Sequence, residues 1–123
     1  MNSIFQKTLT KPVKFQGIGL HSGKKSKITL LPAEENQGII FKRTDIKLNN
    51  LIKAHYDNVS SAKLCTTLQN KFNAKVSTVE HLMAALYIAG IDNVTVEIDN
   101  EEVPIMDGSA KNFFDVLKSA DLT

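Results

Sequence analysis

The sequence is poor in the residues that mark several classes of protein. Its 123 residues include one cysteine, Cys65, and no tryptophan. A single cysteine cannot form an intrachain disulfide, so a disulfide-stabilised secreted scaffold is excluded and a reducing cytoplasm is expected. No apolar run approaches the roughly 18 residues of a membrane helix. The first residues also lack the apolar stretch of a secretory signal, so we expect neither a membrane span nor a signal peptide.

Arginine is almost absent, because Arg43 is the only one among fifteen basic residues. The net charge of +2 conceals a split: residues 1–75 carry thirteen basic and four acidic side chains, and residues 76–123 carry two basic and nine acidic ones. Bidentate recognition of phosphate or guanine depends on arginine. We therefore interpret the basic half as a solvated face, with a site for an anionic ligand as the alternative, and expect no nucleic-acid partner.

The remaining composition is that of an ordinary globular domain, with 42% hydrophobic and 23% charged residues. A chain of this length can bury its own core and is expected to form one domain. Short segments rich in β-branched and apolar residues, bounded by turn residues, predict strands. They are 4–10, 12–16, 26–31, 38–43, 52–56, 64–70 and 93–98.

Two segments have the pattern of helices. Ser77 as N-cap and Glu80 three residues later form a capping box that predicts a helix ending near Ala89, with Gly90 after it. A second helix is expected over about 110–120. The predicted fold class is α+β: a two-layer sandwich in which a mostly antiparallel sheet carries two helices packed on one face.

The first predicted helix has two apolar stripes, where an amphipathic helix has one. The expected core stripe consists of Val79, Leu82, Met83 and Leu86. The second stripe consists of His81, Ala84, Ala85 and Ile88. Either another element packs closely on the second stripe, or the helix is sandwiched within this same domain.

Glu80-His81 is the leading candidate for chemistry. A helix N-terminus favours an ionised carboxylate and a neutral imidazole, as a general base beside a metal ligand requires. The alternative interpretation is that Glu80 serves only the capping box and that His81 is a packed or surface residue, as a lone histidine commonly is. Catalytic zinc takes three protein ligands, and His21, His55 and Cys65 show no spacing that would complete such a site with His81.

Three other segments have plain structural interpretations. The loop from Gly17 to Lys25 is rich in glycine but lacks the Walker A pattern, so it predicts a turn between strands with His21 exposed on it. Cys65 is expected to be a small buried residue of a strand. The segment from Glu102 to Ser109 predicts a loop that caps the second helix.

Taken together, these segments resemble the zinc-dependent UDP-3-O-acyl-N-acetylglucosamine deacetylases of lipid A biosynthesis. The resemblance covers nearly the whole chain, and its blocks occur in the order of the family. The blocks are Gly17-Ile18-Gly19-Leu20-His21-Ser22-Gly23, Arg43-Thr44-Asp45, Leu64-Cys65-Thr66, Ser77-Thr78-Val79-Glu80-His81-Leu82, Ile91-Asp92-Asn93 and Val103-Pro104-Ile105-Met106-Asp107-Gly108-Ser109-Ala110.

The resemblance is to the N-terminal half of the family only. It implies a ribosomal S5 domain 2-like fold, with residues 1–123 as the first of two domains and the C-terminal domain absent from this chain. It also implies that His81 is one of three zinc ligands and that Glu80 is the general base. Leu64, Cys65 and His21 would lie near the substrate, a UDP-linked acylated glucosamine. The second domain would pack on the His81/Ala84/Ala85/Ile88 face and supply the other ligands.

We expect a cytoplasmic protein, and three hypotheses for its function follow from the sequence. The first is half of a zinc deacetylase, inactive without its second domain. The second is a stand-alone α+β module that binds RNA or a protein, in which Glu80-His81 has no role. The third is a degenerate product with an exposed apolar helix face.

Overall fold

Short strands and one α-helix form the part of the chain that the computed structural model describes, which is every residue except 1–4, 62–65, 105–116 and 118–121. The elements, in chain order, are β1 (Val13–Ile18), β2 (Lys25–Pro32), β3 (Ile39–Arg43), β4 (Leu51–Lys53), the 3-10 helix η1 (Tyr56–Asn58), β5 (Val59–Ser61), β6 (Thr67–Gln69), β7 (Lys75–Ser77), α1 (Glu80–Ala89) and β8 (Val94–Ile98). A membrane-crossing helix is not found among these residues.

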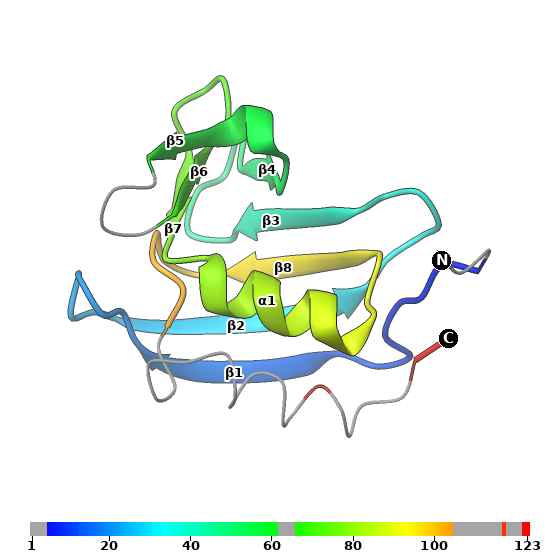
Figure 1. Cartoon of the computed structure of the whole chain (residues 1–123). Coiled ribbons are helices and arrows are strands. Elements are labelled where there is room, and N and C mark those ends of the chain that lie inside the picture. The colour runs from blue at the N-terminus through cyan, green and yellow to red at the C-terminus, as the bar shows by residue number, and fades with distance from the viewer. Residues whose placement is uncertain (1–4, 62–65, 105–116, 118–121) are drawn as a thin grey trace.

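The main layer is a five-stranded sheet with the order β1-β2-β8-β3-β4. Its neighbouring strands are antiparallel except for β3 and β8, which run parallel. A second sheet, β5-β6-β7, is antiparallel and lies beside β4 (Figure 1). The predicted mostly antiparallel sheet is confirmed.

One face of the main sheet forms the core with α1, which lies across β2 and β8 (Figure 1). Alternate residues of neighbouring strands are buried in register: Leu30 faces Val96, and Phe41 faces both Val96 and Ile52. This alternation is the pattern of a sheet with one face covered. The predicted two-layer α+β architecture is confirmed for α1. The second predicted helix, 110–120, lies outside the described residues except for Leu117, which is buried.

The predicted capping box is wrong. Ser77 is the last residue of β7, and its backbone pairs with the segment around Glu102. The helix begins at Glu80, with Val79 at the N-cap and no side-chain cap. The C-terminal prediction is confirmed: the helix ends at Ala89, and Gly90 adopts a left-handed conformation with φ 78°. The Gly90 N–H bonds Tyr87 O and the Ile91 N–H bonds Leu86 O, which is the Schellman arrangement.

The two faces of α1 differ from the predicted stripes at one position. Val79, Leu82 and Leu86 are buried as expected, and Met83 is partly buried against them. Ala85, which borders Leu82 at the edge of this stripe, is also fully buried and belongs to the core. The exposed face carries Ala84, Tyr87 (86% exposed) and Ile88 (62% exposed), with half-buried His81 beside it. An apolar face turned away from the sheet is therefore present, but Ala85 is not part of it.

Several strands are shorter than predicted or were not predicted. The predicted strand 4–10 is absent over its described residues, where Leu9 is buried and makes an isolated bridge with Leu122. The predicted strand 52–56 corresponds to Leu51–Lys53, followed by η1. The three-residue strands β5 and β7 were not predicted, because such short segments show no measurable alternation.

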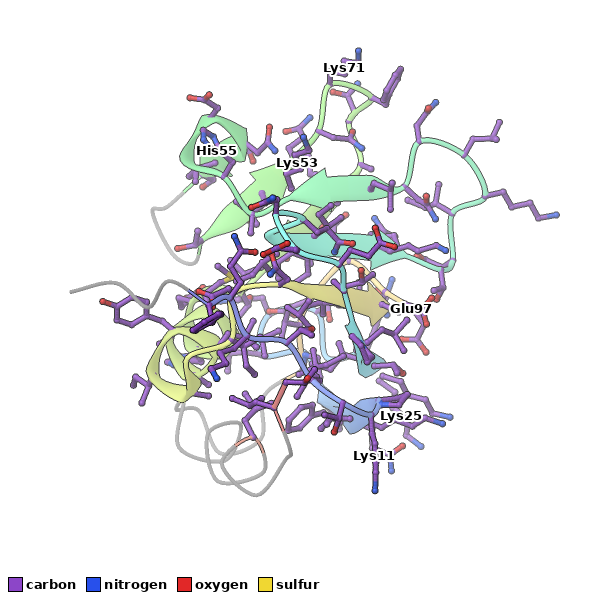
Figure 2. The ribbon with its side chains drawn as sticks, turned by 90° about the vertical axis from the view of Figure 1, so that its right-hand side faces the viewer. Lys11, Lys25, Lys53, His55, Lys71 and Glu97 are labelled. Carbon is purple, nitrogen blue, oxygen red and sulfur yellow. The ribbon has the colours of Figure 1, made fainter. Side chains whose placement is uncertain are left out.

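The open face of the main sheet carries many of the lysines. Lys14, Lys27 and Lys42 alternate along their strands with buried residues, so their side chains stand on the side away from α1. Figure 2 shows Lys25 and Glu97 on this side, and Glu97 lies 4.0 Å from Lys42. These lysines are dispersed and accompanied by an acidic residue, as the solvated-face interpretation requires.

We expect Leu86→Ala to destabilise the chain by about 2–5 kcal/mol, because this fully buried leucine would leave a cavity. Ile88→Ala, on the exposed side of the same helix, should change stability by less than about 0.5 kcal/mol. Urea unfolding followed by circular dichroism measures both. Equal losses for the two variants would contradict the assignment of the buried face.

Candidate functional site

The start of α1 is held against the beginning of β6. The Thr66 N–H donates to Glu80 Oε1 at 3.1 Å, and Thr66 O accepts the Thr78 N–H at 2.9 Å. Glu80 is the first residue of the helix, where the positive end of the helix dipole favours a carboxylate. Glu80 and His81 are both half-buried. The carboxylate of Glu80 is thus fixed at one oxygen by a backbone donor from another element.

Thr78, two residues before the start of α1, has an unusual backbone conformation. Its φ is +60°, in the left-handed region that a β-branched residue rarely adopts. Such a conformation costs about 1–3 kcal/mol and persists only where surrounding contacts hold it. Two contacts do so: the N–H bonds Thr66 O, and the buried hydroxyl donates to Glu102 Oε2 at 2.6 Å.

Glu102 is a buried carboxylate, 3% exposed, at the centre of a hydrogen-bond cluster. The His21 N–H donates to Oε1 and Oε2 at 3.1 and 3.0 Å, and the Ser22 N–H donates to Oε1 at 2.8 Å. With the Thr78 hydroxyl, these donors satisfy both carboxylate oxygens. The cluster connects the turn between β1 and β2 to the start of α1, and Figure 1 shows both at the same end of the molecule.

The glycine-rich turn between β1 and β2 is built around this carboxylate. The Gly19 N–H bonds Lys24 O, and the Gly23 N–H bonds Gly19 O, which closes the turn. Gly23 has a left-handed φ of 69°, and a Cβ on Gly19 would overlap Glu102 Oε1. Consecutive backbone N–H groups in such a turn form an anion-binding concavity. Here the anion is the chain's own Glu102 side chain.

The environment of Glu102 favours its charged form. Burial alone raises the pKa of this carboxyl, but the hydrogen bonds from Thr78, Ser22 and His21 outweigh burial and lower the pKa below its ordinary value of 4.5. Hydrogen bonds to a carboxylate stabilise the ionised form, because the protonated form loses acceptor capacity.

We expect the contribution of Glu102 to stability to depend on pH. Because the folded pKa is lowered, this contribution is complete above the unfolded value near 4.5 and is lost as the pH falls through the folded pKa. Glu102→Gln should therefore destabilise the chain more at pH 7 than at pH 3. Urea unfolding at the two pH values measures this, and an equal destabilisation at both would contradict the charged state.

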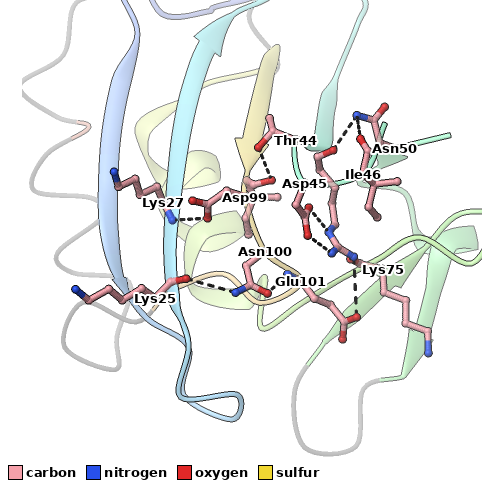
Figure 3. A network of polar contacts seen from close by, with 12 residues as sticks. Lys25, Lys27, Thr44, Asp45, Ile46, Asn50, Lys75, Asp99, Asn100 and Glu101 are labelled. Carbon is pink, nitrogen blue, oxygen red and sulfur yellow. Dashed lines mark hydrogen bonds and ion pairs between the residues drawn. The ribbon is translucent and has the colours of Figure 1, made fainter. Parts of the chain in front are cut away.

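A second polar network surrounds the single arginine, and Arg43 lines the same pocket as Glu102. Figure 3 shows Asp45 and Lys75 of this network. Arg43 bonds Asp45 with two nitrogens, at 3.0 and 2.6 Å, and donates to Lys75 O at 3.2 Å. It thereby ties the end of β3 to β7, which leads into α1. A polar pocket of about 460 Å³ lies between this network and the turn that carries His21. Arg43 is thus engaged within the chain.

The predicted site residues are only partly brought together. Glu80 and His81 adjoin at the start of α1, and the Glu102 cluster connects the His21 backbone to Thr78, two residues before Glu80. His21 is exposed on its turn, as predicted. Leu64 and Cys65 lie outside the described residues. Within the described part of the chain, no three His, Cys, Asp or Glu side chains are grouped to hold a metal, so His81 finds no companion ligands there.

Sequence reasoning missed three residues of this region. Glu102 was assigned to a structural loop, and neither Thr78 nor Thr66 was given a role. A glycine-rich turn that offers several N–H donors is a signal that an anion lies nearby. The sequence does not reveal which carboxylate supplies it, because Glu102 is distant in the chain.

Known proteins match nearly the whole chain. Residues 6–123 match the family model described as UDP-3-O-acyl N-acetylglycosamine deacetylase. Relatives named UDP-3-O-acyl-N-acetylglucosamine deacetylase include one from Geobacter sp. (strain M21), 52% identical over 95% of this chain. Another is from Shewanella frigidimarina (strain NCIMB 400), 48% identical over 97% of this chain.

The matches cover a much smaller share of the relatives than of this chain. The chain spans 38% of the Geobacter protein and 39% of the Shewanella protein. By its match over residues 6–123, the chain belongs to the UDP-3-O-acyl N-acetylglycosamine deacetylase family.

Proposed function

We propose that this chain is the N-terminal domain of a two-domain, zinc-dependent deacetylase. The complete enzyme would remove the N-acetyl group from UDP-3-O-acyl-N-acetylglucosamine in lipid A biosynthesis. The observation that carries the proposal is the match of nearly the whole chain to proteins of this name, of which it spans only 38%. A cytoplasmic location, expected from the single cysteine, belongs to the same proposal.

His81 would hold the zinc ion as one of three protein ligands. The half-buried imidazole at the start of α1 is a suitable donor, since the ring nitrogens of histidine are common zinc ligands. The described residues supply no grouped companions, so the other two ligands would come from the second domain. Bound zinc supplies Lewis-acid polarisation of an amide carbonyl.

Glu80 would act as the general base. Its Oε1 accepts the Thr66 N–H, so we expect Oε2 to take the proton from the water that attacks the acetamide carbonyl. The same carboxyl would then pass the proton to the departing amine, which leaves as the free amino sugar with acetate as the second product. The bond to Thr66 holds the carboxylate in one orientation throughout.

The exposed face of α1 is the expected contact with the second domain. Ala84, Tyr87 and Ile88 place apolar surface where a surface helix normally carries charge. A domain seated there would lie next to His81 and Glu80, so docking and completion of the site would be one event. His21, Leu64 and Cys65 would contribute to the substrate pocket.

The test is acetate release from UDP-3-O-acyl-N-acetylglucosamine by a complete protein. This protein is made by joining the chain to the part of the Geobacter relative that the chain does not match. Zinc-dependent release supports the proposal. Absence of release, together with RNA affinity that falls steeply with salt, would replace it with the binding-module hypothesis.

A further inference from the structure

We propose that Glu102 is a positioning residue that fixes the Glu80-His81 end of α1 and the His21-bearing turn as one unit. The inference rests on the proposed function of Glu80 and His81. Glu102 itself is expected to touch neither substrate nor metal. Its role follows from the contacts of one buried carboxylate with two segments that are far apart in the chain.

The Glu102 side chain bridges two segments of the chain. Glu102 Oε1 accepts the backbone N–H groups of His21 and Ser22, and Oε2 accepts the same His21 N–H together with the Thr78 hydroxyl, the latter at 2.6 Å. The backbone next to Glu102 is fixed as well, since the Val103 N–H bonds Ser77 O at 3.0 Å and the Ser77 N–H bonds Glu101 O at 2.8 Å. The backbone that carries the Glu102 side chain is therefore held in place by hydrogen bonds on both sides.

The bridge holds a residue with a strained backbone. Thr78 has a φ of +60° and lies two residues before Glu80, so its conformation sets the direction in which the chain enters α1. A strained backbone at such a place indicates a function that depends on the geometry. Without the hydrogen bond from the Thr78 hydroxyl to Glu102, the backbone of Thr78 would relax to a more favourable conformation. The start of α1, with Glu80 and His81, would then shift.

The shape of the turn between β1 and β2 fits the Glu102 carboxylate. A Cβ on Gly19 would overlap Glu102 Oε1 and Ser22 Oγ, so the glycine allows the turn to close on the carboxylate. The turn and the start of α1 are thus hydrogen-bonded to the same buried carboxylate. A displacement of one segment is therefore expected to displace the other.

The test uses substitutions at both ends of the bridge. Thr78→Val keeps the shape of the side chain and removes the hydroxyl, Thr78→Ser keeps the hydroxyl, and Glu102→Gln removes the charge. The matched control is Asp99→Asn, because Asp99 also accepts a backbone N–H, that of Lys27 at 2.8 Å, but is not bonded to Thr78. Circular dichroism first establishes that each variant is folded, and Thr78→Val keeps the test available if Glu102→Gln does not fold.

Two readouts are expected to change. In the 123-residue chain, Thr78→Val and Glu102→Gln should shift the amide NMR signals of His21 and Ser22 together with those of Glu80 and His81. In the complete deacetylase, Thr78→Val should lower kcat by about 10- to 100-fold, as displacement of a catalytic group does, with KM changed by less than about threefold. Thr78→Ser should restore both, and Asp99→Asn should alter neither.

Two results would overturn the proposal. One is a folded Thr78→Val chain in which the signals of His21 and Ser22 stay in place. The other is an active complete enzyme whose kcat is unchanged by Thr78→Val. If the wild-type complete protein releases no acetate, the proposed function has failed instead, and the NMR signals alone then decide whether the bridge exists.

Discussion

Glu80→Gln is expected to lower the kcat of the complete deacetylase by about 10²- to 10⁴-fold, the usual contribution of a general base. Glutamine preserves the size of the side chain and the acceptor for the Thr66 N–H, but its amide cannot take a proton from water. Acetate release under saturating substrate measures kcat directly. Zinc content, measured on the same samples, should stay at the wild-type value.

Glu97→Gln is the matched control for this substitution. Glu97 lies on the open face of the main sheet, 4.0 Å from Lys42 and on the side away from α1, so kcat should be unchanged. A Glu80→Gln enzyme within about threefold of wild type would contradict the base assignment, because such a loss is far below the range of general base catalysis.

His81→Ala is expected to lower the zinc affinity of the complete enzyme by more than about 100-fold, since loss of a direct ligand exceeds the usual effect of losing a residue that only orients one. Activity should fall with it. Competition with a chromophoric chelator measures the affinity. The half-buried position of His81 allows alanine to replace it without a core cavity, so the unfolding midpoint should change little.

His55→Ala controls for loss of an imidazole as such, because His55 is exposed and adjoins η1, away from α1. It should leave the zinc affinity unchanged. Unaltered zinc affinity in His81→Ala would contradict the assignment of His81 as a zinc ligand.

Two strands and the end of the helix were predicted correctly from local patterns. Alternation of apolar residues marked β2 and β8, and Gly90 marked the end of α1, because both depend on residues close in the chain. The apolar residues at 84 and 88 correctly indicated an uncovered helix face. Ala85 was misplaced because a small residue near the boundary of two stripes belongs to whichever side packs more closely.

The start of α1 could not be predicted from its sequence alone. Ser77 and Glu80 have the spacing of a capping box, but Ser77 pairs with Thr67 of β6 as the last residue of β7, and its backbone also bridges to Glu102. The left-handed conformation of Thr78 follows from that pairing and from the Glu102 contact. Both interactions join residues distant in the sequence, and they decide the geometry of the Glu80-His81 pair.

The central claim is that this chain holds one half of a composite active site. It is tested by assaying acetate release from UDP-3-O-acyl-N-acetylglucosamine with three samples: the 123-residue chain, the part of the Geobacter relative that the chain does not match, and the two joined in one protein. We predict zinc-dependent release by the joined protein and none by either part. Release by the 123-residue chain alone, at a rate comparable to the joined protein, would contradict the account.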